Sequence, residues 1–359
     1  MIALDAFGDQ DMKALAESYS LRRDFDIRYS PGALCRASLN FSFDAVAYTS
    51  NLENHPGIVR RIAGSRPVIG NSPEVISAAR CWDTLFPRLK QAGFSVPETI
   101  FAGDSRKADT RRRWLVKPVL SGGGHGVSFA QHGQIAGGHF LLQEHLQGKS
   151  CSASFIANGR DCVLIGVAEQ LTGMRQFGSQ GFRYCGNLLP LPEAFAPETG
   201  KDILEQVRRL SGFLTREYGL RGANGMDFIL SGNKVCLTEV NPRYSASMEL
   251  IEQAYELPVF DLHVRAALDG TLPGFKLEAL LSDRKFFGKA ILFAERDTVA
   301  PDTRNWLNGS VHDIPASGEN LHKGSPVCTI LFSRPTHDET LAELISRAGM
   351  LKKEIYASN

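Results

Sequence analysis

Several signals that identify other protein classes are missing from this sequence of 359 residues. No apolar run is long enough to cross a bilayer, and the N-terminus has no basic segment followed by an apolar core and a cleavage site. The seven cysteines form no C-x-x-C pair, and the nine histidines have no zinc-binding spacing. These absences argue against a membrane, secreted or zinc-stabilised protein. We therefore expect a cytoplasmic protein with reduced cysteines.

The charge balance and the lack of hydrolase signatures narrow the function further. The formal net charge is +1, so the chain has no positive excess of the kind that attracts nucleic acid or anionic membranes. No G-x-S-x-G motif is present, and no Ser–His–Asp or Cys–His set stands out. The hydrophobic content of 43% is sufficient for two or three packed cores. We therefore expect more than one packed unit and no nucleic-acid or membrane partner.

The segments 222–230 and 235–243 carry the most informative residues. Apolar, strand-like residues flank the turn Ser231-Gly232-Asn233-Lys234, which predicts a hairpin that places Asp227 opposite Glu239. Glu239 and Asn241 are two residues apart and share one strand face. Two carboxylates and an amide oxygen suit Mg²⁺, which prefers oxygen ligands. The alternative is that these are ordinary edge charges next to an Asn-Pro strand end.

A second motif lies upstream, in residues 114–127. Lys117 stands inside an apolar segment, where a buried ammonium requires an anionic partner. A glycine-rich run follows it, and exposed backbone N–H groups in such a run can cradle phosphate. The run is not a Walker A loop, because no Gly-Lys-Ser/Thr follows it. A flexible hairpin tip is the alternative interpretation. The run comprises Ser121, Gly122, Gly123, Gly124, His125 and Gly126.

In this order, the two motifs resemble those of the ATP-grasp superfamily, over roughly residues 75–250. The resemblance implies that Lys117 contacts the α- and β-phosphates of ATP and that the run 121–126 closes over the triphosphate. It also implies that Asp227, Glu239 and Asn241 hold two Mg²⁺ ions, which Mn²⁺ can replace, with Glu239 bridging them. The family's adenine-binding hinge corresponds to a segment that includes Gln143, Glu144, His145 and Leu146.

The resemblance also assigns roles to basic residues. Arg221 matches a phosphate-binding arginine of ligases similar to D-alanine–D-alanine ligase, and Arg243 matches the arginine of carboxylase-like members. Either could stabilise an acyl phosphate. The family's upstream lysine has no clear counterpart here, and Arg80 and Lys90 are the nearby cations. At the position of the usual ribose-binding acid, the chain reads Gly148-Lys149-Ser150.

Alternating strand and helix patterns predict a parallel α/β unit at the N-terminus, and the resemblance implies the fold class, an α/β and α+β ATP-grasp fold. The N-terminal pattern predicts strands at 2–7, 45–49 and 67–70 and helices at 10–19, 56–63 and 72–92. It resembles the pre-ATP-grasp domain without its first strand–helix unit. Later segments predict a hairpin joined at Asn158-Gly159 and helices at 203–218 and 338–351. The expected divisions are 1–95 (pre-ATP-grasp), 96–148 (small subdomain with the flap), 149–285 (large subdomain with the metal site) and 286–359 (β-rich C-terminal segment).

The whole chain most resembles predicted ATP-dependent carboxylate–amine ligases near the biotin-carboxylase-like branch. Similar members include tyramine–glutamate ligase and other proteins of one-carbon cofactor biosynthesis. The implied reaction forms an acyl phosphate on a carboxylate and then an amide with an amine, releasing ADP and phosphate. The expected partners are these small molecules, and a homodimer is compatible with the resemblance. A kinase of a small hydroxyl compound and a non-catalytic ATP-binding protein are the alternatives.

Overall fold

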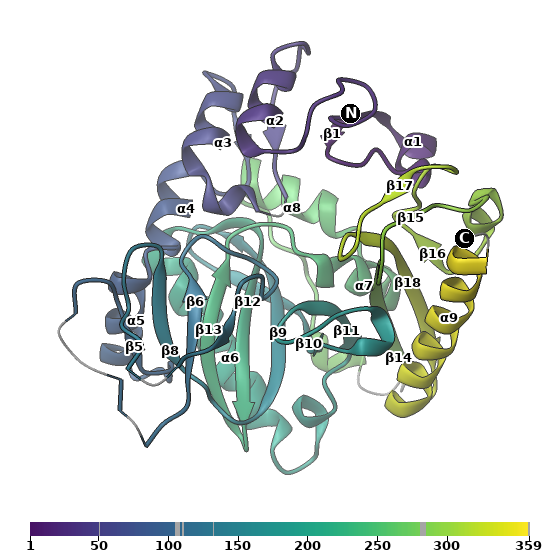
Figure 1. Cartoon of the computed structure of the whole chain (residues 1–359). Helices are drawn as coiled ribbons and strands as arrows, with labels where there is room; N and C mark the ends of the chain where they lie inside the picture. Colours follow the sequence, from purple (N-terminus) through teal and green to yellow (C-terminus); the bar gives the residue numbers. More distant parts are fainter. Residues whose placement is uncertain (50, 105–107, 110, 132, 281–284, 358–359) are drawn as a thin grey trace.

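The computed structural model describes the chain except residues 50, 105–107, 110, 132, 281–284 and 358–359 (Figure 1). Its main element is a sheet of eight strands in the order β13-β12-β9-β10-β11-β14-β18-β16, in which all neighbours are antiparallel. The strands are β9 (Lys149–Asn158), β10 (Cys162–Thr172), β11 (Tyr184–Leu189), β12 (Arg221–Ser231), β13 (Lys234–Asn241), β14 (Phe286–Phe293), β16 (Val311–His312) and β18 (Pro326–Arg334).

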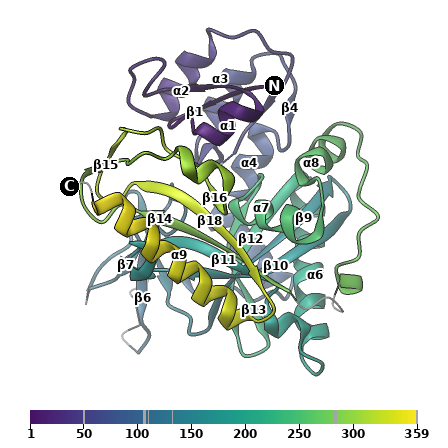
Figure 2. The same cartoon turned by 90° about the vertical axis from the view of Figure 1, so that its right-hand side faces the viewer.

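Helices cover both faces of this sheet. The amphipathic α6 (Gly200–Tyr218) packs its apolar residues on one face, and α9 (His337–Ala357) covers β14 and β18 (Figure 2). The other face is covered by α7 (Ala246–Tyr255) and α8 (Val259–Leu268). The C-terminal strands β14 and β18 thus extend the same sheet that contains the 227–239 hairpin.

A second, four-stranded antiparallel sheet in the order β5-β8-β6-β7 carries Lys117. Its strands are β5 (Thr99–Ile100), β6 (Trp114–Pro118), β7 (Ser128–Phe129) and β8 (Phe140–Glu144). An isolated bridge between Ser95 and Cys236 connects the entry to this sheet with β13. The smaller elements are β15 (Thr298–Val299), which pairs with β17 (Asn320–Leu321), and the 3-10 turns η2 (Arg175–Phe177), η3 (Pro192–Phe195), η4 (Leu277–Leu280) and η5 (Arg304–Asn308).

The N-terminal unit contains two short parallel strand pairs rather than one continuous sheet. The pairs are β1 (Ile2–Asp5) with β2 (Glu17–Ser20), and β3 (Val46–Ala47) with β4 (Val68–Ile69). Its helical elements are α1 (Gln10–Leu15), α2 (Pro31–Ser38), η1 (Leu52–Asn54), α3 (Pro56–Ala63), α4 (Pro73–Ala79) and α5 (Trp82–Gln91).

Two of the expected N-terminal helices were wrong in extent, and one helix was missed. The helix expected at 10–19 ends at Leu15, because the chain then becomes extended and pairs with β1. The helix expected at 72–92 is broken at Arg80 and Cys81, where the backbone leaves helical geometry. The missed α2 has local signals, a Ser30 side chain that caps Ala33 N–H and a proline at its first turn.

The hairpins and the large helices agree with the sequence pattern. β12 and β13 meet at the predicted turn, and β9 and β10 meet next to Asn158-Gly159. Among the described residues, no helix is both long and apolar enough to cross a membrane.

Candidate active site

The β12–β13 hairpin brings Asp227 and Glu239 into direct register, as the sequence predicted. Asn241 pairs with Gly225 two positions along, so its side chain lies on the same sheet face. Asn241 donates its amide Nδ2 to Asp227 Oδ2 at 3.0 Å. All three oxygen-bearing side chains therefore gather at one end of the hairpin.

Two cations lie against Glu239. Arg80 donates Nη1 to Glu239 Oε1 at 2.6 Å, and Lys117 Nζ lies 3.6 Å from Oε2. Both cations also lie over the ring of Trp82, at 5.3 Å for the guanidinium carbon and 4.3 Å for the ammonium. The break between α4 and α5 thus places Arg80, one of the two cations left open by the sequence, at the hairpin. The other cation, Lys90, is paired with Glu98 on the surface.

Burial sets the electrostatics of this cluster. It raises the pKa of Asp227, and the nearby negative charge of Glu239 raises it further. Burial also opposes ionisation of Glu239, but Lys117 and Arg80 outweigh it and lower the pKa of that carboxyl. The pKa of Lys117 is lowered by its own burial, which Glu239 counteracts. Two facing buried carboxylates that repel one another are the arrangement that a bound cation stabilises.

Arg243 follows the hairpin and is also buried. It donates Nη2 to Glu53 Oε1 at 2.7 Å and Nη1 to the Tyr244 carbonyl at 3.1 Å. The same Nη2 lies 3.5 Å from Asn241 Oδ1, at the limit of a hydrogen bond. Arg243 is therefore next to the proposed metal ligands, as its position in the sequence predicted.

Arg221 is not brought to this cluster. It begins β12, pairs with Asn158, and has an exposed side chain. Asp227 lies six residues further along the same strand, about 20 Å away at the usual rise of a strand. The resemblance had assigned Arg221 a phosphate-binding role, but an extended backbone separates it from this cluster. The arginine that contacts Glu239 is Arg80, and not Arg221.

Strands outside the motifs supply further polar residues that sequence reasoning missed. Gln170 on β10 donates Nε2 to Asp227 Oδ1 at 2.8 Å. Asn187 on β11 donates Nδ2 to Ser152 Oγ at 3.3 Å and accepts a hydrogen bond from the Tyr184 hydroxyl. The register places these residues on the same sheet face as Asp227. The only local signal was polar residues in otherwise apolar strands.

The glycine-rich flap lies over neighbouring backbone. Ser121 donates Oγ to the His125 carbonyl at 2.6 Å, and Tyr184 N–H donates to the Gly123 carbonyl at 2.9 Å. Gly124 has a φ of +72°, and a Cβ there would come within 1.9 Å of the Phe182 carbonyl oxygen. Glycine is thus required for this approach. His125 itself is exposed.

The hinge segment has buried polar atoms without partners. Gln143 is 4% exposed, and its Nε2 has no hydrogen-bond partner in the described structure. His145 Nδ1 is also buried and has no partner among the described residues, while its ring packs on Phe129 and Phe182. Glu144 is engaged by Arg112 Nη1 at 2.9 Å, and Leu146 is half-buried. Such unpartnered atoms fit a ligand that has hydrogen-bonding groups of its own.

The fit to a metal rests on the chemistry of the donor set. Among the described residues, no group of three or more His, Cys, Asp or Glu side chains is placed to hold an ion. A metal site here would use two carboxylates and the amide of Asn241, a set of oxygen donors that suits Mg²⁺. The buried, mutually repelling carboxylates fit such an ion.

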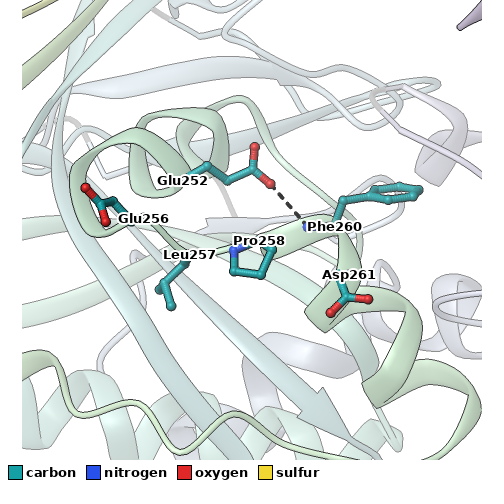
Figure 3. Close-up of a pocket in the computed structure, with 6 residues that line it drawn as sticks. All are labelled: Glu252, Glu256, Leu257, Pro258, Phe260 and Asp261. Carbon is teal, nitrogen blue, oxygen red and sulfur yellow. Dashed lines mark hydrogen bonds between the residues drawn. The ribbon is translucent and has the colours of Figure 1, made fainter. Parts of the chain in front are cut away.

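A surface hollow lies elsewhere, between the end of α7 and the start of α8 (Figure 3). Glu252 accepts a hydrogen bond from Phe260 N–H at 3.2 Å on its rim. None of the predicted site residues lines it. Its lining residues are Glu252, Glu256, Leu257, Pro258, Phe260 and Asp261.

Comparison with known proteins identifies the domain and its relatives. Residues 83–247 match the model of an ATP-grasp domain. An uncharacterized protein of Methanocaldococcus jannaschii is 26% identical over 284 residues, covering 76% of this chain and 65% of that protein. A formate-dependent phosphoribosylglycinamide formyltransferase of Solidesulfovibrio magneticus is 25% identical over 278 residues, covering 70% of this chain and 66% of that protein. The chain therefore spans slightly less than two thirds of the length of these curated relatives.

Solved structures share the fold. The biotin carboxylase domain of Hydrogenobacter thermophilus 2-oxoglutarate carboxylase, in complex with MgADP, has a TM-score of 0.67 at 14% identity, covering 95% of this chain and 82% of that one. An L-amino acid ligase from Bacillus licheniformis has a TM-score of 0.65 at 14% identity, covering 98% and 97%. Residues 83–247 therefore match an ATP-grasp domain, and the chain shares the fold of these solved structures.

Proposed function

We propose that this protein is an ATP-dependent ligase that joins a carboxylate to an amine. The carrying observation is that Lys117, Arg80 and Arg243 converge on the face that bears Asp227, Glu239 and Asn241. The names of the relatives, a formate-dependent formyltransferase and an L-amino acid ligase, support the same class of acid-activating chemistry.

In this proposal, each group at the site binds or orients part of ATP. Asp227, Glu239 and Asn241 would hold two Mg²⁺ ions, which would supply positive charge to neutralise the transferred phosphoryl group. Mn²⁺ would serve in their place. Lys117 and Arg80 leave Glu239 to bind phosphate oxygens, and the flap from Ser121 to Gly126 excludes water. The segment 143–146 holds the adenine.

Arg243 faces the position where the acyl phosphate forms. Its planar guanidinium matches the charge that develops on phosphoryl and carboxyl oxygens. Phosphoryl transfer of this kind depends on positioning and charge stabilisation and requires no protein nucleophile. An amine then attacks the acyl carbon, forming the amide and releasing phosphate.

We further propose that the chain divides functionally at residues 95, 148 and 285, as the sequence suggests, and that the acid and amine come from cofactor biosynthesis. Glutamate and tyramine are the first pair to test. The protein is proposed to act in the cytoplasm, either alone or as a homodimer.

The test is a screen of carboxylates for ADP release in the presence of Mg-ATP, with hydroxylamine as a surrogate amine. A ligase is expected to convert its acid to a hydroxamate. Formation of a stable phosphate ester would instead indicate a kinase. ATP binding with neither product in a broad screen would contradict both activities and favour a non-catalytic ATP-binding protein.

A further inference from the structure

Two consecutive residues of η1 contact the two arginines of the candidate active site. Glu53 Oε1 accepts a hydrogen bond from Arg243 Nη2 at 2.7 Å, and Asn54 Oδ1 accepts one from Arg80 Nη2 at 2.6 Å. Both contacts come from the N-terminal unit, outside the hairpin, the flap and the hinge. One short turn therefore reaches both arginines at once.

The Glu53–Arg243 pair is withdrawn from solvent. The side chain of Glu53 is 1% exposed and that of Arg243 is 10% exposed. Within the described parts of the chain, Glu53 is the only acid that forms an ion pair with Arg243. A buried ion pair has little freedom to rearrange, because separating its members leaves an unpaired charge in a dry environment. Glu53 therefore restricts the orientation of the guanidinium.

Asn54 connects Arg80 with the flap. Its Nδ2 lies 3.4 Å from the Ser121 carbonyl, and Arg80 Nη2 lies 3.4 Å from the same oxygen. Asn54 Nδ2 also donates to Asn51 Oδ1 at 2.9 Å, which fixes the amide within its own turn. The first residue of the flap, Arg80 and η1 thus share one small hydrogen-bonded group.

The two arginines differ in their acidic partners. Arg80 shares Glu239 with Lys117, and Glu239 is itself a proposed metal ligand. Arg243 instead has a partner that is not among those ligands. Occupation of the metal site would therefore draw Glu239 away from Arg80 and leave the Glu53–Arg243 pair in place.

We propose that Glu53 and Asn54 are positioning residues of this active site. Glu53 holds the guanidinium of Arg243 toward the forming acyl phosphate, and Asn54 holds Arg80 and the start of the flap over the nucleotide. Neither residue touches the reacting atoms. This inference rests on the proposed ligase function.

The kinetic test is a double-mutant cycle with Glu53→Gln and Arg243→Lys. Glu53→Gln is expected to lower kcat about tenfold or more and to change the KM for ATP less than about twofold, because misplacement of an orienting group affects the transition state most. In the Arg243→Lys background, the same change is expected to have little further effect. Independent, additive losses would overturn the proposal.

A second readout does not depend on turnover. In protein with ¹⁵N-labelled arginine, the side-chain signal of Arg243, assigned with Arg243→Lys, is expected to exchange slowly with water and to shift in Glu53→Gln. An unchanged signal would overturn the role of Glu53 even if the protein is a ligase. A shifted signal in a protein that makes no hydroxamate would uphold the positioning contact and remove only the proposed reaction.

Controls separate positioning from folding. Glu74→Gln removes an acid that is also paired with an arginine, Arg60, but on the exposed surface, and it is expected to leave kcat and the Arg243 signal unchanged. If Glu53→Gln does not fold, Glu53→Asp keeps the charge but shortens the reach, and an intermediate loss of kcat is expected. Wild-type kcat in a folded Glu53→Asp would overturn the proposal.

Asn54→Ala tests the proposed role of Asn54 in holding Arg80 and the start of the flap. It is expected to raise the KM for ATP about tenfold, with a smaller change in kcat, because Arg80 and the flap act on bound nucleotide. An unchanged KM for ATP in a folded Asn54→Ala variant would remove Asn54 from the proposal.

Discussion

Arg80 and Glu239 are 159 residues apart in the sequence, and a 2.6 Å hydrogen bond joins Arg80 Nη1 to Glu239 Oε1. The side chains are 7% and 12% exposed, and Lys117 shares the same carboxylate. Arg80 and Lys117 thus share a single acidic partner, Glu239. Under the proposed function, the phosphates of a nucleotide would bind these cations once a metal ion has bound the acid.

Glu239→Gln is expected to abolish turnover, because it removes a proposed metal ligand. The structure adds a second effect, since the change leaves Arg80 and Lys117 without their common acid. Unpaired buried charge typically costs about 3–5 kcal/mol, so the melting temperature of the nucleotide-free protein is expected to fall. Differential scanning calorimetry and an ADP-release assay measure the two effects. Turnover within tenfold of wild type would contradict the metal-binding role.

Arg243→Lys is expected to reduce kcat about 100-fold while ATP affinity, measured by calorimetry, stays nearly constant. A compact ammonium cannot reproduce the planar contacts of a guanidinium. Arg221→Lys is the matched control, because Arg221 is an exposed arginine at the far end of β12. It is expected to leave kcat unchanged. An equal loss of kcat in the two variants would contradict a specific role of Arg243 in the reaction.

Gly124→Ala is expected to weaken ATP binding about tenfold or more by preventing the flap from settling. The new Cβ would meet the Phe182 carbonyl at 1.9 Å. Gly133→Ala provides the control, because Gly133 has a similar φ of +78° but no atom of the described, non-adjacent residues within 4 Å of the added carbon. Both variants carry the backbone strain of a positive φ, about 1 kcal/mol, and only Gly124→Ala carries the clash. Calorimetric affinities that fall equally would show that strain alone is responsible.

His263 is expected to make stability depend on pH. Its Nδ1 accepts a hydrogen bond from Ala223 N–H at 2.8 Å, and its Nε2 lies 3.2 Å from the Ile69 carbonyl, so the neutral ring joins β4 to β12. Burial lowers the pKa of this imidazole from its usual 6.5. The unfolded chain therefore takes up a proton first as pH falls, and stability is lost below about pH 6.5.

The measurement is the free energy of unfolding between pH 8 and pH 5 for wild type and His263→Gln. The variant is expected to be less stable at pH 8 by about 1–3 kcal/mol, the cost of leaving a buried donor unpaired. The difference from wild type is expected to narrow toward pH 5, because glutamine does not titrate. Parallel pH profiles would show that another group carries the dependence.

The local part of the site was predictable from sequence. A tight turn between two apolar strands places Asp227 opposite Glu239 by period and register alone, and the register agrees. The same holds for the strand position of Lys117 in β6. Hairpins depend on contacts between neighbours in the chain, so a few adjacent residues are enough to predict their geometry.

The rest of the site depended on tertiary structure. Arg80, which contacts Glu239, stands at the break between α4 and α5, and an unbroken helical pattern gave no sign of that break. Glu53 and Gln170 come from η1 and β10, whose places beside the hairpin follow from the packing of the N-terminal unit and from the strand order of the main sheet. Arg221 shows the converse, since six residues of extended strand separate it from Asp227 on the same strand. Sequence by itself determined the strand position of Lys117 and the hairpin of acids. The partners that orient the arginines were decided by long-range packing, because burial and strand order join residues that no local pattern connects.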